Sequence, residues 1–319
     1  MDFNLTPEQE AVRALAQRFA TQEVAPQAAR IDREARFPLA LMRQAGDLGL
    51  LGMLTAPEYG GNRMGYIALA LVVETLAAAC ATTAFVFDVQ VTTIIDPLQR
   101  FGTAAQSARW LPGLSNGTLL GAFAITEPEA GSDAAAMRTR AERDGDAYVL
   151  NGQKTFITNA GLADLYLVFA RTQPGAGSRG ISALLVERDT PGLSWGPPMA
   201  KLGLHGSVNA EVYFDNCRVP CSHLLGEEDG GFTIAMITLD YGRIGIAAQS
   251  VGIAQGAFTY ALAYARQRHA FGQPIVQFQS LQFLLANLAT RIEAARHLTY
   301  KAAHLADMGD AQLTRYAAM

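Results

Sequence analysis

The chain has 319 residues, and 25 lysines and arginines against 29 aspartates and glutamates give a formal net charge of −4. Hydrophobic residues make up 50% and charged residues 17% of the chain, a balance that excludes a disordered protein. The absence of a basic excess argues against a nucleic-acid-binding protein. This length is near the limit for one hydrophobic core, so we expect two or three packed units.

Other features of the sequence bear on compartment and metal content. The three cysteines are too few for a disulfide framework, and no second cysteine pair or HExxH motif accompanies them, so we predict no metal site. The N-terminus has no signal-peptide pattern, and the most apolar stretch is interrupted by Glu74 and Asp88. We therefore predict a cytoplasmic protein with no membrane span.

Residues 1–114 have helical spacing and are predicted to form an N-terminal helical domain. The segment TPEQ at residues 6–9 is typical of a capping box with proline at the first helical position, and the helix it begins is predicted to end at Pro26. The further helices that we predict cover residues 38–48, 66–80, 85–101 and 104–111, the last of them ending at Pro112-Gly113.

Residues 115–228 consist of short apolar runs between turn signals and are predicted to form a middle antiparallel β domain. Asp144-Gly145 and Asn151-Gly152 are typical of hairpin turns, because glycine and asparagine adopt positive φ at little cost. The predicted strands cover residues 119–125, 138–143, 147–150, 155–158, 165–170, 181–186 and 211–214.

Residues 229–319 return to the helical period, with long helices predicted over 230–267 and 277–307 and a third beginning after residue 310. Two long helices and a short one cannot bury one another's apolar faces as a bundle does. We therefore expect a shortened C-terminal helical domain in which positions such as Ile234, Ile246 and Leu285 need cover. The predicted fold class is α+β, in the order helical, β, helical.

Two segments carry the strongest chemical signal. ITEPEAGSD at residues 125–133 is a strand end followed by a loop that offers hydroxyls and backbone N–H groups. Alone, it would be explained as an ordinary turn ending in a helix cap. The segment NGQKTFITNAG at residues 151–161 places Phe156 and Thr158 on one side of a strand, and an aromatic ring beside a hydroxyl suits a flat heteroaromatic ligand.

These segments resemble the paired signatures of the acyl-CoA dehydrogenase family, whose domains follow the same order. The resemblance extends from LTPEQEAVR at residues 5–13, through PEYGG at 57–61, to the last helix. LDYGRIGIA at 239–247 and GIAQ at 252–255 most resemble the short-chain, butyryl-CoA-like branch. The resemblance implies an FAD-dependent α,β-dehydrogenation of short acyl-CoA thioesters in fatty acid metabolism. It also implies a homotetramer and an electron-transfer flavoprotein as electron acceptor.

The resemblance implies flavin contacts on both segments, with Thr126 near the isoalloxazine edge and Ser132 facing the acyl-CoA. Phe156 stands where family members usually carry Trp, so stacking is kept and the indole N–H is lost. Arg268, Phe271 and Gln279 match positions that reach the FAD of a neighbouring subunit, where arginine suits a pyrophosphate. The implied flavin contacts of the subunit itself are Phe123, Ile125, Thr126, Gly131, Ser132, Phe156, Ile157 and Thr158.

The implied substrate contacts are Ser132 and the helix turn formed by Asp240, Tyr241, Gly242 and Arg243. A glycine inside a helix costs about 1 kcal/mol relative to alanine, so Gly242 indicates the close approach of another group. Some branches carry their catalytic glutamate at this position, where this chain has glycine.

No residue is assigned as the catalytic base. In the short-chain branch, the base lies in a tyrosine–glutamate–glycine segment near the C-terminus, and no acid before Met319 matches it. We therefore expect the 319-residue chain not to dehydrogenate acyl-CoA. Two alternatives stay open: a truncated, non-catalytic paralogue, and a flavin oxidase of the same fold that passes electrons to oxygen. His205 stands where the family commonly has arginine and is assigned no role.

Overall fold

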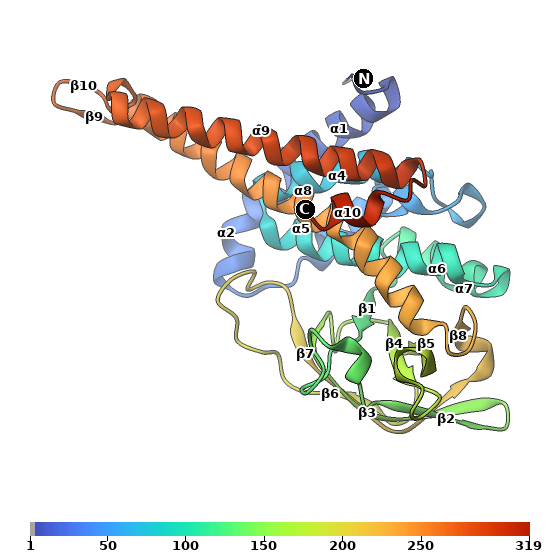
Figure 1. Cartoon of the computed structure of the whole chain (residues 1–319). Coiled ribbons are helices and arrows are strands. Elements are labelled where there is room, and N and C mark those ends of the chain that lie inside the picture. Colours follow the sequence, from blue (N-terminus) through green and yellow to red (C-terminus); the bar gives the residue numbers. More distant parts are fainter. Residues whose placement is uncertain (1–3) are drawn as a thin grey trace. The chain divides into compact units, whose positions relative to one another are not determined.

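A computed structural model describes residues 4–319, and these residues form two compact units. One unit contains the described residues up to Ala29 together with Met64–Phe85 and Arg243–Met319, and the other contains Arg30–Arg63 and Val86–Gly242. The first unit is built mainly of helices and the second of a sheet with helices. Along the chain, helices are followed by strands and then by helices again, so the predicted α+β class is confirmed (Figure 1). The boundaries at residues 114 and 228 stay a prediction.

The first helix, α1 (Pro7–Phe19), begins as predicted. The Gln9 N–H donates to Thr6 Oγ1 at 3.2 Å and the Thr6 N–H donates to Gln9 Oε1 at 3.0 Å, which completes the capping box. The predicted end at Pro26 is wrong. The chain continues through a π-helical turn, η1 (Ala20–Val24), into α2 (Ala25–Arg33). The hydrogen-bond register already shifts in the π turn, so a proline without an N–H is accommodated directly after it.

Two further helical predictions need correction at prolines or at their ends. The run predicted over 85–101 begins earlier and consists of α5 (Ala81–Asp88), the π-helical η4 (Val89–Ile95) and α6 (Asp96–Phe101). Helix α7 (Ala104–Ser115) passes through Pro112, because Leu111 and Leu114 are buried while Pro112 and Ala108 face solvent. The Ala108 carbonyl, which loses its helical partner at Pro112, belongs to an exposed residue and is open to water. The remaining helices of the N-terminal part are α3 (Leu39–Asp47) and α4 (Gly65–Ala79), with short 3₁₀ turns at Leu51–Leu54 and Pro57–Tyr59.

The sheet has the strand order β6-β7-β3-β2-β4-β5-β8, with β1 paired to β4. Most pairs are antiparallel, as predicted, but β1 and β2 each run parallel to β4. The strands are β1 (Gly121–Ala124), β2 (Arg140–Asp144), β3 (Ala147–Thr158), β4 (Leu165–Arg171), β5 (Ile181–Glu187), β6 (Leu193–Trp195), β7 (Asn209–Pro220) and β8 (Leu224–Leu225).

Only one of the two predicted hairpin turns exists. Gly145 lies in the β2–β3 turn with φ +62°. Asn151-Gly152 lies instead inside β3, where the pairing with β7 shifts register, so one strand of 12 residues replaces the two short strands predicted. Gly152 is required there, because a Cβ would lie 2.5 Å from Thr139 Oγ1 and φ is +151°. Beyond this bulge, β3 continues to pair with β7 from Gly152 to Thr158.

Buried polar side chains fix the position of β1 beneath the helices of its unit. The Gly121 N–H donates to Gln90 Oε1 at 2.9 Å, and the Gly121 carbonyl accepts from Asn159 Nδ2 at 2.9 Å. A Cβ at Gly121 would lie 2.4 Å from Ile94, so η4 packs directly on this strand. Residues of β4 alternate between two hydrophobic clusters, with Leu167 and Phe169 in one and Tyr166 and Val168 in the other. The sheet is thus buried on both faces around β4.

The C-terminal part forms a long helical hairpin, α8 (Gly231–Gln267) and α9 (Gln279–Asp307), which run side by side and are joined through β9 (His269–Ala270) and β10 (Gln273–Pro274) (Figure 1). A short helix, α10 (Leu313–Ala317), follows. At its far end the hairpin caps α4, because Asp307 accepts from the N–H groups of Tyr66 at 2.6 Å and Ile67 at 3.1 Å.

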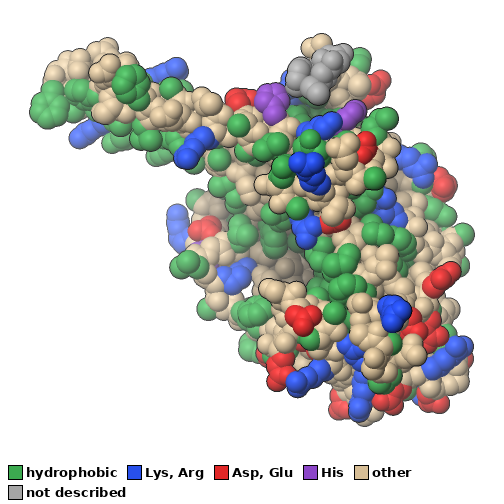
Figure 2. Space-filling view, viewed as in Figure 1, with side chains coloured by type: hydrophobic (Ala, Val, Ile, Leu, Met, Phe, Trp, Pro, Cys, Tyr) green, Lys and Arg blue, Asp and Glu red, His purple; other side chains and the backbone are tan. Residues whose placement is uncertain are grey.

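Hydrophobic side chains are exposed along this hairpin (Figure 2). Ile246 is exposed, as expected, whereas Ile234 is buried in the cluster that also contains Ile125, so the expectation that Ile234 needs cover is wrong. Its position at the start of α8 places it on the sheet rather than on the hairpin. No helix within residues 4–319 is both long and apolar enough to cross a membrane.

We predict that replacing Asp88 changes the pH dependence of stability. Asp88 is 2% exposed, its Oδ1 has no hydrogen-bond partner among the described residues, and burial raises the pKa of its carboxyl from 3.8 to about 8. Because the folded protein holds this proton more tightly than the unfolded chain, Asp88 contributes less stability as the pH rises from about 4 to 8. The side chain of Asp88→Asn stays neutral at every pH. The free energy of unfolding of this variant should therefore rise relative to that of the wild type over this range, by a few kcal/mol at neutral pH.

The measurement is urea unfolding of both proteins from pH 4 to pH 9, with Asp47→Asn on the exposed end of α3 as control. A difference between Asp88→Asn and wild type that does not vary with pH would contradict the buried carboxylic acid.

Candidate functional site

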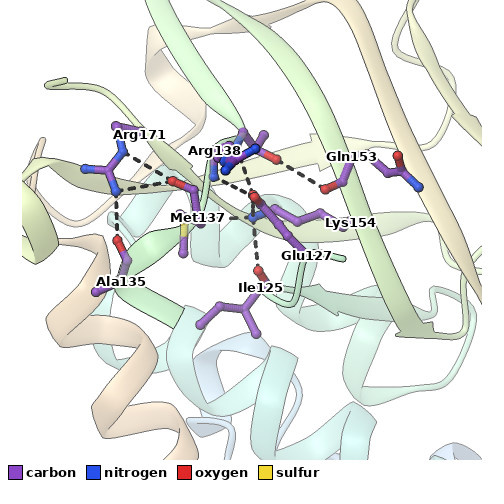
Figure 3. Close-up of polar contacts among 9 residues, drawn as sticks. Ile125, Glu127, Ala135, Met137, Arg138, Gln153, Lys154 and Arg171 are labelled. Carbon is purple, nitrogen blue, oxygen red and sulfur yellow. Dashed lines mark hydrogen bonds and ion pairs between the residues drawn. The ribbon is translucent and has the colours of Figure 1, made fainter. Parts of the chain in front are cut away.

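The loop that follows β1 is fastened by a buried ion pair (Figure 3). Lys154 is fully buried in β3, and its Nζ donates to Glu127 Oε1 at 2.8 Å and to the Ile125 carbonyl at 3.0 Å. Glu127 also accepts from the N–H groups of Arg138 at 2.5 Å and Thr139 at 2.9 Å. The two segments singled out in the sequence are therefore joined by one lysine and one glutamate.

Burial and charge act in opposite directions on this pair. Burial lowers the pKa of Lys154 to about 8, although Glu127 opposes this shift. Burial alone would raise the pKa of Glu127, but the Lys154 ammonium and the donated hydrogen bonds outweigh it and leave that pKa below 4.5. Glu127 thus contributes stability above pH 4.5, and this contribution is lost as the pH falls through its folded-state pKa.

A second anchor holds the far end of the same loop. Arg171, at the end of β4, donates from Nη2 to the Ala135 carbonyl at 2.8 Å and from Nε to the Met137 carbonyl at 3.3 Å (Figure 3). The segment between the anchors is exposed at Gly131 and Ser132, and a Cβ at Gly131 would meet nothing within 4 Å. A loop that is held at both ends and exposed in its middle can present backbone N–H groups to a ligand without rearrangement.

The end of β3 presents an aromatic ring beside this loop. The Thr155 N–H donates to the Thr126 carbonyl at 2.9 Å, which joins the strand to the loop. Directly after this contact the pairing of β3 with β7 shifts register, and Phe156 has φ +58° and a 66% exposed side chain. A phenylalanine in the left-handed region raises the free energy of the folded state, and its exposed ring gains nothing from burial. Strained residues of this kind are concentrated at ligand-binding sites.

Asn209, at the start of β7, fixes the geometry of this strand end. Its Nδ2 donates to the Phe156 carbonyl at 3.1 Å and to Thr158 Oγ1 at 3.0 Å. The amide therefore holds the residue that carries the exposed ring and the hydroxyl two positions further on in one arrangement. Because Asn209 contacts the backbone of Phe156 and not its ring, this partner does not test whether the two side chains share a side of the strand, and that stays a prediction.

The predicted flavin contacts divide into exposed and buried groups. Thr126 and Thr158 are half-buried at the surface of the unit. Ile125 and Ile157 are 9% and 2% exposed and lie in different core clusters, so their side chains support the sheet and only their backbone groups could contact a ligand. Phe123 is half-buried and its ring lies 5.0 Å from that of Phe169.

The predicted substrate contacts at the α8 turn belong in part to the same unit. The Arg100 guanidinium lies 3.8 Å from the centre of the Tyr241 ring and pairs with Asp96 at 2.8 Å, so α6 orients this turn. A Cβ at Gly242 would meet Thr92 Oγ1 at 3.7 Å, an ordinary contact. Packing within the chain therefore does not require this glycine. Asp240 is half-buried and Arg243 is exposed.

The three residues assigned to a neighbouring subunit's cofactor lie together at the tip of the α8–α9 hairpin. Arg268, Phe271 and Gln279 are all exposed, and Phe271 is 96% exposed with φ +53°. Its ring packs edge-on against Phe278 at 6.0 Å between centroids. They belong to the unit that contains Arg243–Met319, whereas the loop and strand residues belong to the other unit.

Several residues that build the site carried only a weak signal in the sequence. Lys154 and Glu127 stand inside the two motifs, but the residues around Lys154 are mostly polar, so nothing in the strand marked the lysine as buried. Asn209 and Arg100 gave no signal, because their roles depend on contacts between distant elements. His205 pairs with Asp32 at 2.8 Å, a surface contact. Residues 4–319 contain no group of three His, Cys, Asp or Glu side chains placed to hold a metal ion.

The chain is similar to known proteins along its whole length. Three family models match the chain: acyl-CoA dehydrogenase N-terminal domain at residues 6–118, middle domain at 122–217 and C-terminal domain at 229–319. The chain belongs to the acyl-CoA dehydrogenase family.

Relatives within the family are similar over almost the whole chain. A short-chain-specific acyl-CoA dehydrogenase of Clostridium acetobutylicum is 43% identical over 97% of this chain and 82% of its own length. The structure of butyryl-CoA dehydrogenase from Megasphaera elsdenii is 42% identical, with TM-score 0.97 over 100% of this chain and 84% of that one. A chain solved in work on the electron transferring flavoprotein of Acidaminococcus fermentans is 43% identical, with TM-score 0.98 over 100% and 84%. The resemblance to the short-chain branch is thereby confirmed.

We predict that Lys154→Met destabilises this acyl-CoA dehydrogenase by about 3–5 kcal/mol, because it leaves the Glu127 carboxylate buried without its partner. Urea unfolding at pH 7 measures the loss. The double variant Glu127→Gln/Lys154→Met removes both charges and should recover part of it. A loss below about 1 kcal/mol, the range of an exposed pair, would show that the pair does not fasten the loop.

Proposed function

We propose that the protein dehydrogenates short, straight-chain acyl-CoA thioesters between the α- and β-carbons, with FAD as cofactor. The observation that carries the proposal is the junction of the two motifs. Phe156 is exposed with a positive φ on the strand that carries Thr158, and this strand is joined to the loop of Thr126 by the Lys154–Glu127 pair and by the bond from the Thr155 N–H to the Thr126 carbonyl. The short-chain relatives from Clostridium acetobutylicum and Megasphaera elsdenii support the choice of substrate class.

The residues at this junction suit an isoalloxazine ring. Phe156 offers a flat apolar face, and the half-buried hydroxyls of Thr126 and Thr158 suit the polar edge of such a ring. Neither hydroxyl has an acceptor among residues 4–319. Gly131, where an added Cβ would meet nothing, and Ser132 leave the backbone of the loop open to a polar group. The donor set thus matches a flavin better than it matches a metal ion.

The roles of the protein's own groups follow from these positions. Bound FAD would supply the acceptor for the hydride that leaves the β-carbon. Thr126, Phe156 and Thr158 would hold and orient the flavin, and the anchors at Glu127 and Arg171 would keep the loop from moving as substrate enters. The flavin edge would also be lined by backbone groups, those of Ile125, Gly131, Ile157 and the strand β1 that contains Phe123.

On the substrate side, Ser132 and the α8 turn from Asp240 to Arg243 would contact the acyl-CoA. Gly242 lacks a packing reason within the chain, and this supports a ligand as the group that approaches it. Tyr241 is held by Arg100 and can therefore act as a rigid wall. No residue of this chain is assigned to removal of the α-proton.

The proposal extends to assembly and electron transfer. We infer a homotetramer in which Arg268, Phe271 and Gln279 reach the FAD of a neighbouring subunit, and their common exposure at the hairpin tip supports this assignment. The proposed electron acceptor is an electron-transfer flavoprotein. This choice is supported by the similar chain that was solved in work on the electron transferring flavoprotein of Acidaminococcus fermentans. A cytoplasmic location completes the proposal. Both named relatives with a stated activity are dehydrogenases, which favours dehydrogenation over the oxidase alternative.

We predict that Thr158→Ala weakens FAD retention, raising the dissociation constant about tenfold, because one hydrogen bond to the ring edge is lost. Flavin absorbance after gel filtration and titration of the apoprotein with FAD measure the effect. Thr190→Ala, the same change on a turn after β5, should bind as the wild type does. A wild-type protein that takes up no FAD would remove the cofactor from the proposal.

We predict that kcat/KM is highest for short, straight acyl-CoA substrates such as butyryl-CoA. The reason is the resemblance of residues 239–247 to the short-chain branch together with the short-chain relatives. The measurement is a comparison of butyryl-, octanoyl-, palmitoyl- and isovaleryl-CoA with a dye acceptor, using the protein in its full natural length. A maximum at palmitoyl- or isovaleryl-CoA would overturn the substrate class and leave the cofactor untouched.

A further inference from the structure

The orientation of the Asn209 side-chain amide is fixed by chemistry on both of its sides. Its Nδ2 faces the Phe156 carbonyl at 3.1 Å, and a carbonyl can only accept. Its Oδ1 faces Lys201 Nζ at 3.1 Å, and an ammonium can only donate. A flipped amide would set an N–H₂ group against the ammonium and an oxygen against the carbonyl, so this side chain has one possible orientation.

Lys201 is itself held in place. Besides Asn209, its Nζ donates to the carbonyls of Leu204, at 2.9 Å, and Ser207, so its three N–H groups have three acceptors. The lysine stands in the segment KLGLHGS at residues 201–207, which leads into β7. A rigid ammonium therefore sets the polarity of the amide beside it.

This polarity passes on to Thr158. Because Asn209 Nδ2 can only donate, Thr158 Oγ1 accepts the hydrogen bond of 3.0 Å between them, and the hydroxyl keeps its own proton for another partner. Within the part of the chain that the structure describes, no acceptor faces that proton. Thr158 is half-buried and lies two positions after Phe156, whose side chain is exposed, so the proton is available to a ligand that contacts this strand end.

We propose that Lys201 and Asn209 are positioning residues that make the Thr158 hydroxyl an obligatory hydrogen-bond donor to the flavin edge. The proposal rests on the proposed function and deepens it. The series runs from a cation, through an amide, to a hydroxyl, and each member donates towards the ligand. It therefore favours any increase of negative charge on the flavin edge, as occurs when the flavin is reduced.

Asn209→Asp tests the polarity, because a carboxylate has nearly the same shape and can only accept. Thr158 would then turn its proton towards residue 209 and present a lone pair to the flavin. We expect the FAD dissociation constant to rise about tenfold and the reduced-to-oxidised ratio at a fixed potential to fall by a similar factor. The measurements are titration of the apoprotein with FAD and spectroscopic reduction against a reference dye.

A double-variant comparison separates the hydroxyl from a simple charge effect. In a Thr158→Val background there is no hydroxyl to turn, so Asn209→Asp should change binding and the reduced-to-oxidised ratio by less than about twofold. Lys201→Met should shift both quantities in the same direction as Asn209→Asp, without adding a charge, and it provides the test if Asn209→Asp does not fold. Asn216→Asp, at the other end of the β3–β7 pair, is the matched control and should behave as the wild type.

Wild-type behaviour of both Asn209→Asp and Lys201→Met in a protein that binds FAD would overturn this inference and leave the proposed function standing. An undiminished effect of Asn209→Asp in the Thr158→Val background would also overturn it. A wild-type protein that binds no FAD would overturn the proposed function and this inference together.

Discussion

The arrangement of the site depends on one buried ion pair. Lys154 and Glu127 lie in segments separated by more than twenty residues of sequence, and their contact joins the loop after β1 to the end of β3. Neither charge could be buried alone, because the free energy of removing an unpaired ion from water is several kcal/mol. The loop and the strand therefore fold into contact together. The positions of the candidate ligand contacts between Ile125 and Thr158 depend on that pair.

The surrounding fold extends the same logic with neutral groups. Gln90 accepts from the Gly121 N–H and Asn159 donates to the Gly121 carbonyl, so the position of β1, which leads into the loop, is fixed. Arg171 then fixes the exit of the loop. Polar side chains that bind backbone in this way leave no choice of register, whereas apolar contacts alone would tolerate small shifts. A ligand site composed largely of backbone needs this kind of support.

The sequence was sufficient for features with a local cause. The capping box at Thr6 and Gln9, the turn at Gly145 and the helical period of residues 230–307 depend on neighbours within a few positions. The predictions at Pro26, Pro112 and Gly152 are wrong because the effect of each residue depends on its tertiary surroundings. Pro26 follows a π-helical turn, Pro112 faces solvent between two buried leucines, and Gly152 lies in a bulge opposite β7. For the site, the motifs indicated which segments matter, but Asn209 and Arg100 act across elements far apart in sequence and left no local pattern.

The cap that Asp307 provides for α4 has a consequence for synthesis on the ribosome. The first turn of α4 leaves the ribosome some 240 positions before the carboxylate that accepts its N–H groups. Until then the cap that Asp307 provides is missing. The unit of Arg30–Arg63 and Val86–Gly242, in contrast, is entirely synthesised before α9 begins. The order of translation thus favours early folding of the unit that contains the sheet, while α4 waits as an apolar helix in need of protection from aggregation until α9 emerges.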